Sequence, residues 1–157
     1  MTDIPAHGPL AVVHKARSVL DATPYSALAL IARAATFTVF FRSGLQKLSD
    51  WNSTVLLFEN EYHVPVLPPV FAAHMATAME LGASTLVLVG LLTRLSTLAL
   101  LGMVAVIQLF VYPEAWPDHL QWVAFMALIV ARGPGRISLD AALGRLWGHP
   151  APVPSRA

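Results

Sequence analysis

The feature that most restricts the fold of this chain is a long apolar stretch, Val70–Leu92, that contains one carboxylate, Glu80. A helix rises about 1.5 Å per residue, so a stretch of this length can cross the roughly 30 Å hydrocarbon layer of a bilayer. Glu80 would then lie about 15 Å deep, near the middle of that layer. An ionisable group at this depth requires a partner or a proton. The sequence therefore predicts a spanning helix whose carboxylate is paired, functional or both.

Composition places the whole chain in the membrane class. Of its 157 residues, 56% are hydrophobic and only 12% are charged, and the mean hydropathy is +0.62. The formal charge of +1 provides no basic excess for binding nucleic acid. Cysteine is absent, which excludes disulfides, thiolate metal sites and iron–sulfur clusters built by this chain. Electron chemistry would therefore need a bound cofactor.

Three further segments complete a membrane domain over residues 24–147. The first span is Tyr25–Leu48, and the third is Leu95–Val111. The fourth begins near Pro113 or Pro117, because proline is tolerated in a first helical turn, and it ends before Gly133. We therefore expect an all-α integral membrane protein, a four-transmembrane-helix bundle that contacts the lipid bilayer.

The segments outside the spans are expected to lie in water or on the membrane surface. Residues 1–23 form a polar lead-in that is not a secretory signal, because the apolar run after it is too long. In the second connection, Ser53–Glu61 is compatible with a short surface helix capped by Asn52 or Ser53. Ile137–Trp147 has one apolar face and predicts an amphipathic C-terminal surface helix. The proline-rich tail, residues 148–157, is predicted to be disordered.

The charged residues predict the orientation of the four spans. An even number of spans puts both termini on one side of the membrane. That side holds Lys15, Arg17, Arg94, Arg132, Arg136 and Arg145, and the other holds Asp50, Glu59, Glu61, Glu114 and Asp118, with Lys47 as the main basic exception. The positive-inside rule then places both termini in the cytoplasm.

Glu80 and Arg33 are the candidate catalytic residues. Helical spacing surrounds Glu80 with small residues, which allow a neighbouring helix to approach closely. Arg33 lies on an inward-facing stripe of the first span at a similar depth, so we expect an Arg33–Glu80 pair. Two interpretations remain open. The pair is a structural link that fixes helix register, or Glu80 exchanges a proton in the service of a ligand or a proton path.

Several polar side chains are candidates for a cofactor site near the outer end of the bundle. His63, His74 and His119 map to this end, where imidazoles can be interfacial, bind a divalent metal with Glu59 and Glu61, or donate a hydrogen bond to a quinone carbonyl. A haem between His74 and His119 is a further alternative. No single helix carries metal-ligand spacing, so no metal site is predicted.

Two more polar residues lie one helical turn apart, Gln108 and Tyr112. They are either an interhelical hydrogen-bond pair or contacts to a substrate. The residues that we consider for binding a cofactor are Lys47, Gln108, Tyr112, His74 and His119.

Three motifs together resemble the DoxX family of small four-helix membrane proteins. They are Arg33 with Ser43–Leu48, Glu80 before Gly90–Arg94, and Gly133–Asp140. The resemblance covers about residues 25–145. The family positions that it implies here are Arg33, Gly44, Lys47, Glu80, Arg94, Gly135, Ser138 and Asp140.

This resemblance implies a bacterial inner-membrane protein linked to redox systems, such as subunits of a thiosulfate:quinone oxidoreductase or membrane partners in oxidative-stress or metal-stress complexes. It also implies a soluble or membrane partner protein. The lack of cysteine argues against sulfur chemistry by this chain's own thiols. Two hypotheses follow: a quinone-linked redox subunit, or a non-catalytic module that anchors or assembles a partner or passes a small solute. The small-residue faces also permit a homodimer.

Overall fold

The computed structural model describes residues 12–14, 18, 22–62 and 64–147. Every element in this part of the chain is helical. Most of the predicted lead-in, the whole 148–157 tail and His63, with Lys15 and Arg17, lie outside the described residues.

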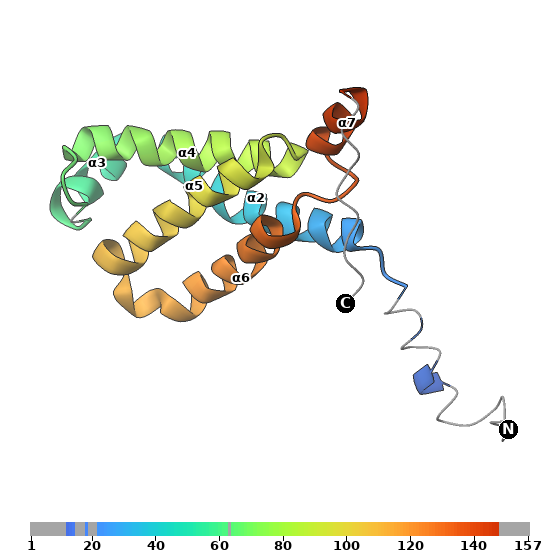
Figure 1. Ribbon diagram of the computed structural model, residues 1–157. Coiled ribbons are helices and arrows are strands. Elements are labelled where there is room, and N and C mark those ends of the chain that lie inside the picture. The colour runs from blue at the N-terminus through green and yellow to red at the C-terminus, as the bar shows by residue number, and fades with distance from the viewer. Residues whose placement is uncertain (1–11, 15–17, 19–21, 63, 148–157) are drawn as a thin grey trace, which may run out of the picture.

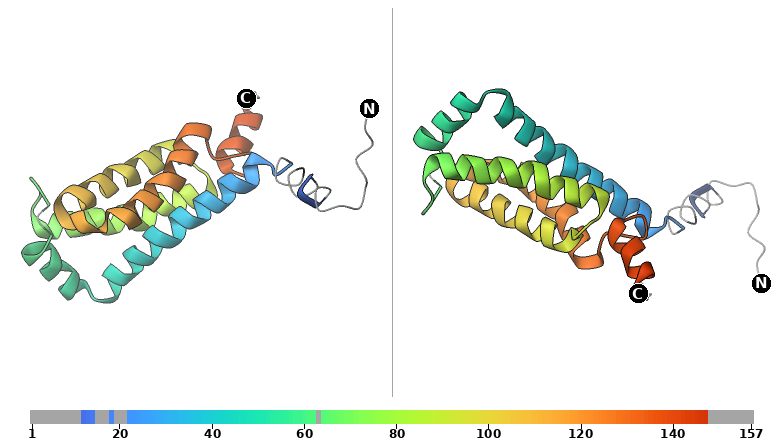
Figure 2. Two further views of the ribbon diagram at one scale, coloured as in Figure 1. Left: turned by 90° about the horizontal axis from the view of Figure 1, so that it is seen from below. Right: turned by 90° about the horizontal axis from the view of Figure 1, so that it is seen from above.

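Four long helices form the body of the protein (Figure 1). The helices, in chain order, are α2 (Tyr25–Ser49), α3 (Trp51–Asn60), α4 (Pro69–Val89), α5 (Thr93–Val106), the π-helix η1 (Ile107–Val111), the 3-10 helix η2 (Pro113–Ala115), α6 (Trp116–Arg132) and α7 (Leu139–Leu146). Helix α2 packs against α4 and α6, and α5 packs against the same two helices. The result is a four-helix bundle, with α3 at one end and α7 at the other (Figure 2).

Three of these segments are long and apolar enough to cross a membrane. They are Tyr25–Ser49 with 25 residues, Pro69–Val89 with 21, and Thr93–Val111 with 19. Helix α6 has 17 residues and packs in the same bundle. The predicted all-helical membrane architecture is therefore confirmed for three spanning segments.

The bundle is apolar on the outside and partly polar on the inside. Its centre contains large buried side chains such as Phe40, Leu100 and Met126, and the Phe40 ring meets Trp122 edge-on at 5.7 Å between centroids. Threonines and serines are buried beside them, whereas other apolar side chains face outward, such as Leu28, Leu98 and Ile31, which is 66% exposed. An outward apolar face suits lipid, and small hydroxyl residues suit close helix packing in a membrane.

Helix ends follow local capping chemistry. Asp50 caps α3, because its carboxylate accepts from the Ser53 backbone N–H at 3.0 Å and from the Ser53 hydroxyl at 2.6 Å. These hydrogen bonds lower the pKa of the Asp50 carboxyl below its usual value. The predicted cap at Asn52 or Ser53 was therefore wrong, since the helix begins one residue after Asp50. Ser138 caps α7, which is shorter than the Ile137–Trp147 prediction.

Candidate functional site

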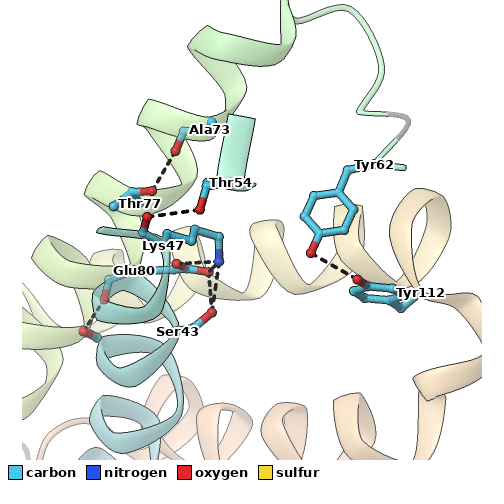
Figure 3. A network of polar contacts seen from close by, with 9 residues as sticks. Ser43, Lys47, Thr54, Tyr62, Ala73, Thr77, Glu80 and Tyr112 are labelled. Atoms are coloured by element: carbon cyan, nitrogen blue, oxygen red, sulfur yellow. Dashed lines mark hydrogen bonds and ion pairs between the residues drawn. The ribbon is translucent and has the colours of Figure 1, made fainter. Parts of the chain in front are cut away.

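Glu80 is buried at 3% exposure, and its carboxylate is bound by two side chains from α2 (Figure 3). Lys47 Nζ lies 2.8 Å from Oε1 and 2.9 Å from Oε2. The Ser43 hydroxyl donates to Oε1 at 3.1 Å, and Lys47 Nζ also donates to Ser43 Oγ at 3.0 Å. One ammonium and one hydroxyl thus satisfy the buried carboxylate. We call Ser43, Lys47 and Glu80 the ion-pair cluster.

The predicted Arg33–Glu80 pair was wrong, because the partner of Glu80 is Lys47. Helices α2 and α4 are antiparallel, so a residue early in α2 lies opposite a residue late in α4. Arg33 accordingly reaches Val87 and Leu88, about two turns beyond Glu80. Glu80 lies against Gly44 of α2, and the Lys47 side chain, one turn further along α2, binds its carboxylate. Similar depth in the membrane does not determine the register of two antiparallel helices, and this register decides the partner of Glu80.

Gly44 allows α2 and α4 to approach closely at the ion-pair cluster. A Cβ atom at this position would lie 2.7 Å from the Leu81 side chain and 3.2 Å from Glu80 Cβ. Beside it, the Thr54 hydroxyl donates to the Lys47 carbonyl oxygen at 3.0 Å and holds α3 to the end of α2 (Figure 3). The close approach shields the pair, since the exposed side-chain fractions are 18% for Lys47 and 4% for Glu80.

Arg33 is 2% exposed, and its guanidinium donates only to backbone carbonyls among the described residues. Nε donates to Val87 O at 2.9 Å, and Nη2 donates to Leu88 O. Nη1 donates to Pro134 O at 3.0 Å and to Ile137 O. The last carbonyls of a helix lack intrahelical partners and carry partial negative charge. Arg33 therefore caps the C-terminal end of α4 and links the segment after α6 to this helix end.

Asp140 completes this end of the bundle. Its carboxylate accepts from the backbone N–H groups of Leu92 and Thr93 at 2.8 and 2.9 Å, and from the Thr93 hydroxyl at 2.7 Å. Its own backbone N–H donates to Gly90 O at 2.7 Å. A carboxylate at the start of α5 is favourable because the first N–H groups of a helix are unpaired. We call Arg33, Asp140 and the backbone that they bind the polar lock.

Two glycines in the polar lock have positive φ angles. Gly90 ends α4 at φ 74°, and Gly135 has φ 79° in the connection after α6. A Cβ on Gly135 would lie 3.0 Å from both Ser26 Cα and Ala29 Cβ of α2. The resemblance had implied Gly135, Ser138 and Asp140 without a role, and the structure gives each of them a place in this junction.

At the other end of the bundle, Tyr112 joins two connections. Its hydroxyl lies 3.0 Å from Glu61 Oε1. It also lies 3.1 Å from the Tyr62 hydroxyl (Figure 3). His74 makes separate contacts, with Nδ1 2.8 Å from Val70 O and the ring 4.4 Å from Trp51 between centroids. Gln108 and Tyr112 thus bind different segments rather than one another.

The structure brings Gln108 and His119 together. Gln108 Oε1 lies 2.7 Å from His119 Nδ1, and Gln108 Nε2 donates to Pro113 O at 2.7 Å. Lys47, His74 and Tyr112 make their contacts elsewhere, so the candidate cofactor residues are distributed over several places. Within the described part of the chain, no group of three histidine or carboxylate side chains is arranged to hold a metal ion.

An apolar groove of about 300 Å³ lies between α5 and α6 beside this histidine. Val104, Leu120 and Val123 are among its apolar lining residues, and Trp116, Gln108 and His119 also line it. The sequence identified Gln108 and His119 separately, but their pairing depends on the turn through Pro113, which brings the two helices together. Ser43 likewise had no assigned role, although it lies one turn before Lys47 on the stripe that contains Gly44.

The fold and its buried charges define a small, multi-helix membrane protein with a polar interior. The DoxX family model matches residues 28–113, which is more than half of the chain, so the chain belongs to the DoxX family. The matched segment runs from the first turn of α2 to the first residue of η2 and includes Arg33, Lys47 and Glu80. Searches of curated proteins and of solved structures found no match.

Proposed function

We propose that this chain is a four-helix subunit of the bacterial inner membrane that anchors or assembles a partner protein. The observation that supports this function is the internal satisfaction of its buried charges. Glu80 is bound by Lys47 and Ser43, and Arg33 is bound by backbone carbonyls. Both charged groups are occupied in holding helices together, which favours a structural role over a proton path.

The fourth span in this proposal is α6. Together η2 and α6 run from Pro113 to Arg132, a length sufficient to cross the hydrocarbon layer. Helix α7 would lie on the membrane surface next to the polar lock, with its exposed Leu146 and Trp147 toward lipid.

Charge distribution supports an orientation with both termini in the cytoplasm. The end of the bundle near α7 holds Arg94, Arg132, Arg136 and Arg145, and the end near α3 holds Asp50, Glu59, Glu61, Glu114 and Asp118. Because the chain has no cysteine, single-cysteine variants test the orientation directly. In intact spheroplasts, an impermeant maleimide should label Glu59→Cys at once and Arg136→Cys only after lysis. The reverse pattern would contradict the orientation.

The anchoring role is tested by removing both charges of the ion-pair cluster. The double variant Glu80→Gln with Lys47→Gln keeps hydrogen-bonding groups but can no longer carry the same charge or exchange a proton at Glu80. For an anchor, the partner that co-purifies with the native chain should co-purify with the double variant in proportion to the amount of folded protein. Loss of a cellular phenotype at full protein level, with the partner still bound, would argue for chemistry at Glu80.

A redox or stress-response subunit linked to quinone is the second candidate, and the groove between α5 and α6 favours it. A volume of about 300 Å³ is at the lower end of the range for small-molecule sites, and the groove combines apolar walls with a buried imidazole. This candidate predicts quinone in the lipid extract of purified protein. It also predicts that Glu80→Gln abolishes electron transfer from the partner while leaving the protein folded.

A further inference from the structure

His119 lines the otherwise apolar groove and has one imidazole nitrogen that can still form a hydrogen bond. The residue is 4% exposed and lines the groove together with Trp116. Its Nδ1 atom binds Gln108, and among the described residues Nε2 has no hydrogen-bond partner. No fully buried side-chain nitrogen or oxygen in this part of the chain lacks a partner, so Nε2 is not sealed inside the protein. His119 is one of the residues that line the groove.

The hydrogen bonds of Gln108 determine which imidazole nitrogen carries the proton. Pro113 O can only accept, so the amide nitrogen of Gln108 must face it, as the 2.7 Å contact shows. The amide oxygen then faces His119 Nδ1, which must donate. In a neutral imidazole with the proton on Nδ1, Nε2 is an acceptor. The groove therefore ends in a hydrogen-bond acceptor.

The backbone is irregular at this same position. Gln108 lies in η1, the five-residue π-helix that follows α5. Such π-helical turns are rare and frequently occur at functional sites. Here the wider turn ends at Val111 and precedes the Tyr112–Pro113 turn, which supplies the carbonyl oxygen that orients the Gln108 amide.

We propose that the groove binds a neutral, apolar aromatic molecule with a hydroxyl group, which donates a hydrogen bond to His119 Nε2. A lipophilic phenol or a hydroquinone has this chemistry. The walls of Val104, Leu120 and Val123 bind its apolar part, and Trp116 lies beside its ring. The proposal requires binding only and holds whether or not the chain takes part in electron transfer or in anchoring a partner.

The test uses two probes that differ by one hydrogen-bond donor, 4-tert-butylphenol and its methyl ether, 4-tert-butylanisole. Binding to the full chain in nanodiscs is followed by tryptophan emission, since Trp116 lines the groove and Trp122 lies 4.9 Å from the His119 ring. For each protein, the affinity for the phenol is divided by the affinity for the anisole. If the phenol makes one hydrogen bond to His119, this ratio should be about three- to tenfold larger for native protein than for His119→Phe. Comparing the two proteins cancels the different partitioning of the probes into lipid.

A matched control is His74→Phe, which removes an imidazole from α4 outside the groove and should keep the native preference. Gln108→Leu removes the group that fixes the tautomer and should reduce the preference while keeping His119. The ligand's redox state gives a further comparison. Duroquinol should bind more tightly than duroquinone, because the oxidised form offers only acceptors to an acceptor nitrogen.

Nitrogen-15 NMR of histidine-labelled native protein measures the tautomer without any substitution, so the proposal remains testable if His119→Phe does not fold. The expected spectrum shows His119 protonated on Nδ1, with an Nε2 shift that moves on adding the phenol and not the anisole. A phenol preference that survives in folded His119→Phe, equal binding of duroquinol and duroquinone, or an Nε2-protonated His119 would overturn the proposal. None of these results bears on the anchoring function.

Discussion

Lys47 and Glu80 form an ion pair across α2 and α4, with Lys47 Nζ 2.8 Å from Glu80 Oε1. The contact joins the C-terminal end of α2 to the middle of α4, and Gly44 allows the close approach that buries it. Because the Glu80 carboxylate is almost fully buried, its negative charge is stabilised by this one ammonium and by the Ser43 hydroxyl. The two charges are therefore paired only when α2 and α4 are in this register.

Removing one partner of this pair should destabilise the protein strongly. Glu80→Gln leaves the Lys47 ammonium half-buried without its counter-charge, and Lys47→Met leaves the Glu80 carboxylate buried. Loss of one partner of a buried pair costs about 3–5 kcal/mol, and loss of both costs much less. Thermal melting in detergent should therefore rank the double variant Glu80→Gln with Lys47→Met above either single variant. Arg42→Gln, which removes an exposed cation from the same helix, should melt close to the native protein.

Gly44→Ala tests the close helix approach independently of charge. The new methyl group would meet the Leu81 side chain at 2.7 Å, so α2 and α4 must separate or Leu81 must change rotamer. We expect a loss of about 1–3 kcal/mol in unfolding free energy. Gly82→Ala is the matched control, because no atom lies within 4 Å of a Cβ at that position. Equal melting of the two variants would contradict the role of Gly44.

The sequence predicts the helices well because apolar length and proline or glycine at the ends are local properties. It also predicts the inward face of the first span, since Arg33 is buried as its position on that face indicates. The partner of Glu80 is not a local property. It depends on where two antiparallel helices are in register, and the short α3 and its Asp50 cap contribute to that register. The Gln108–His119 contact was beyond prediction for a similar reason, because the π-helical turn that sets it has no clear sequence signal.

Arg33→Lys should loosen the polar lock while preserving charge. Lysine has a single ammonium and cannot reach carbonyls on both α4 and the connection after α6 as the planar guanidinium does. We expect faster trypsin cleavage at Arg136, an exposed site within the connection that the guanidinium fastens. Limited proteolysis followed by mass spectrometry measures the rate. Arg42→Lys is the control, and unchanged cleavage in Arg33→Lys would show that the connection is held by other contacts.

The Tyr112 hydroxyl should make stability depend on alkaline pH. Burial raises its pKa above the ordinary 10.0, and hydrogen bonds with Tyr62 and Glu61 raise it further. Because the folded state holds this proton more tightly than the unfolded state does, the contribution to stability is complete below about pH 10 and declines as the pH rises above that value. Melting temperatures measured from pH 8 to pH 11 should fall more steeply for the native protein than for Tyr112→Phe. Parallel curves would mean that the link between the two connections does not depend on this proton.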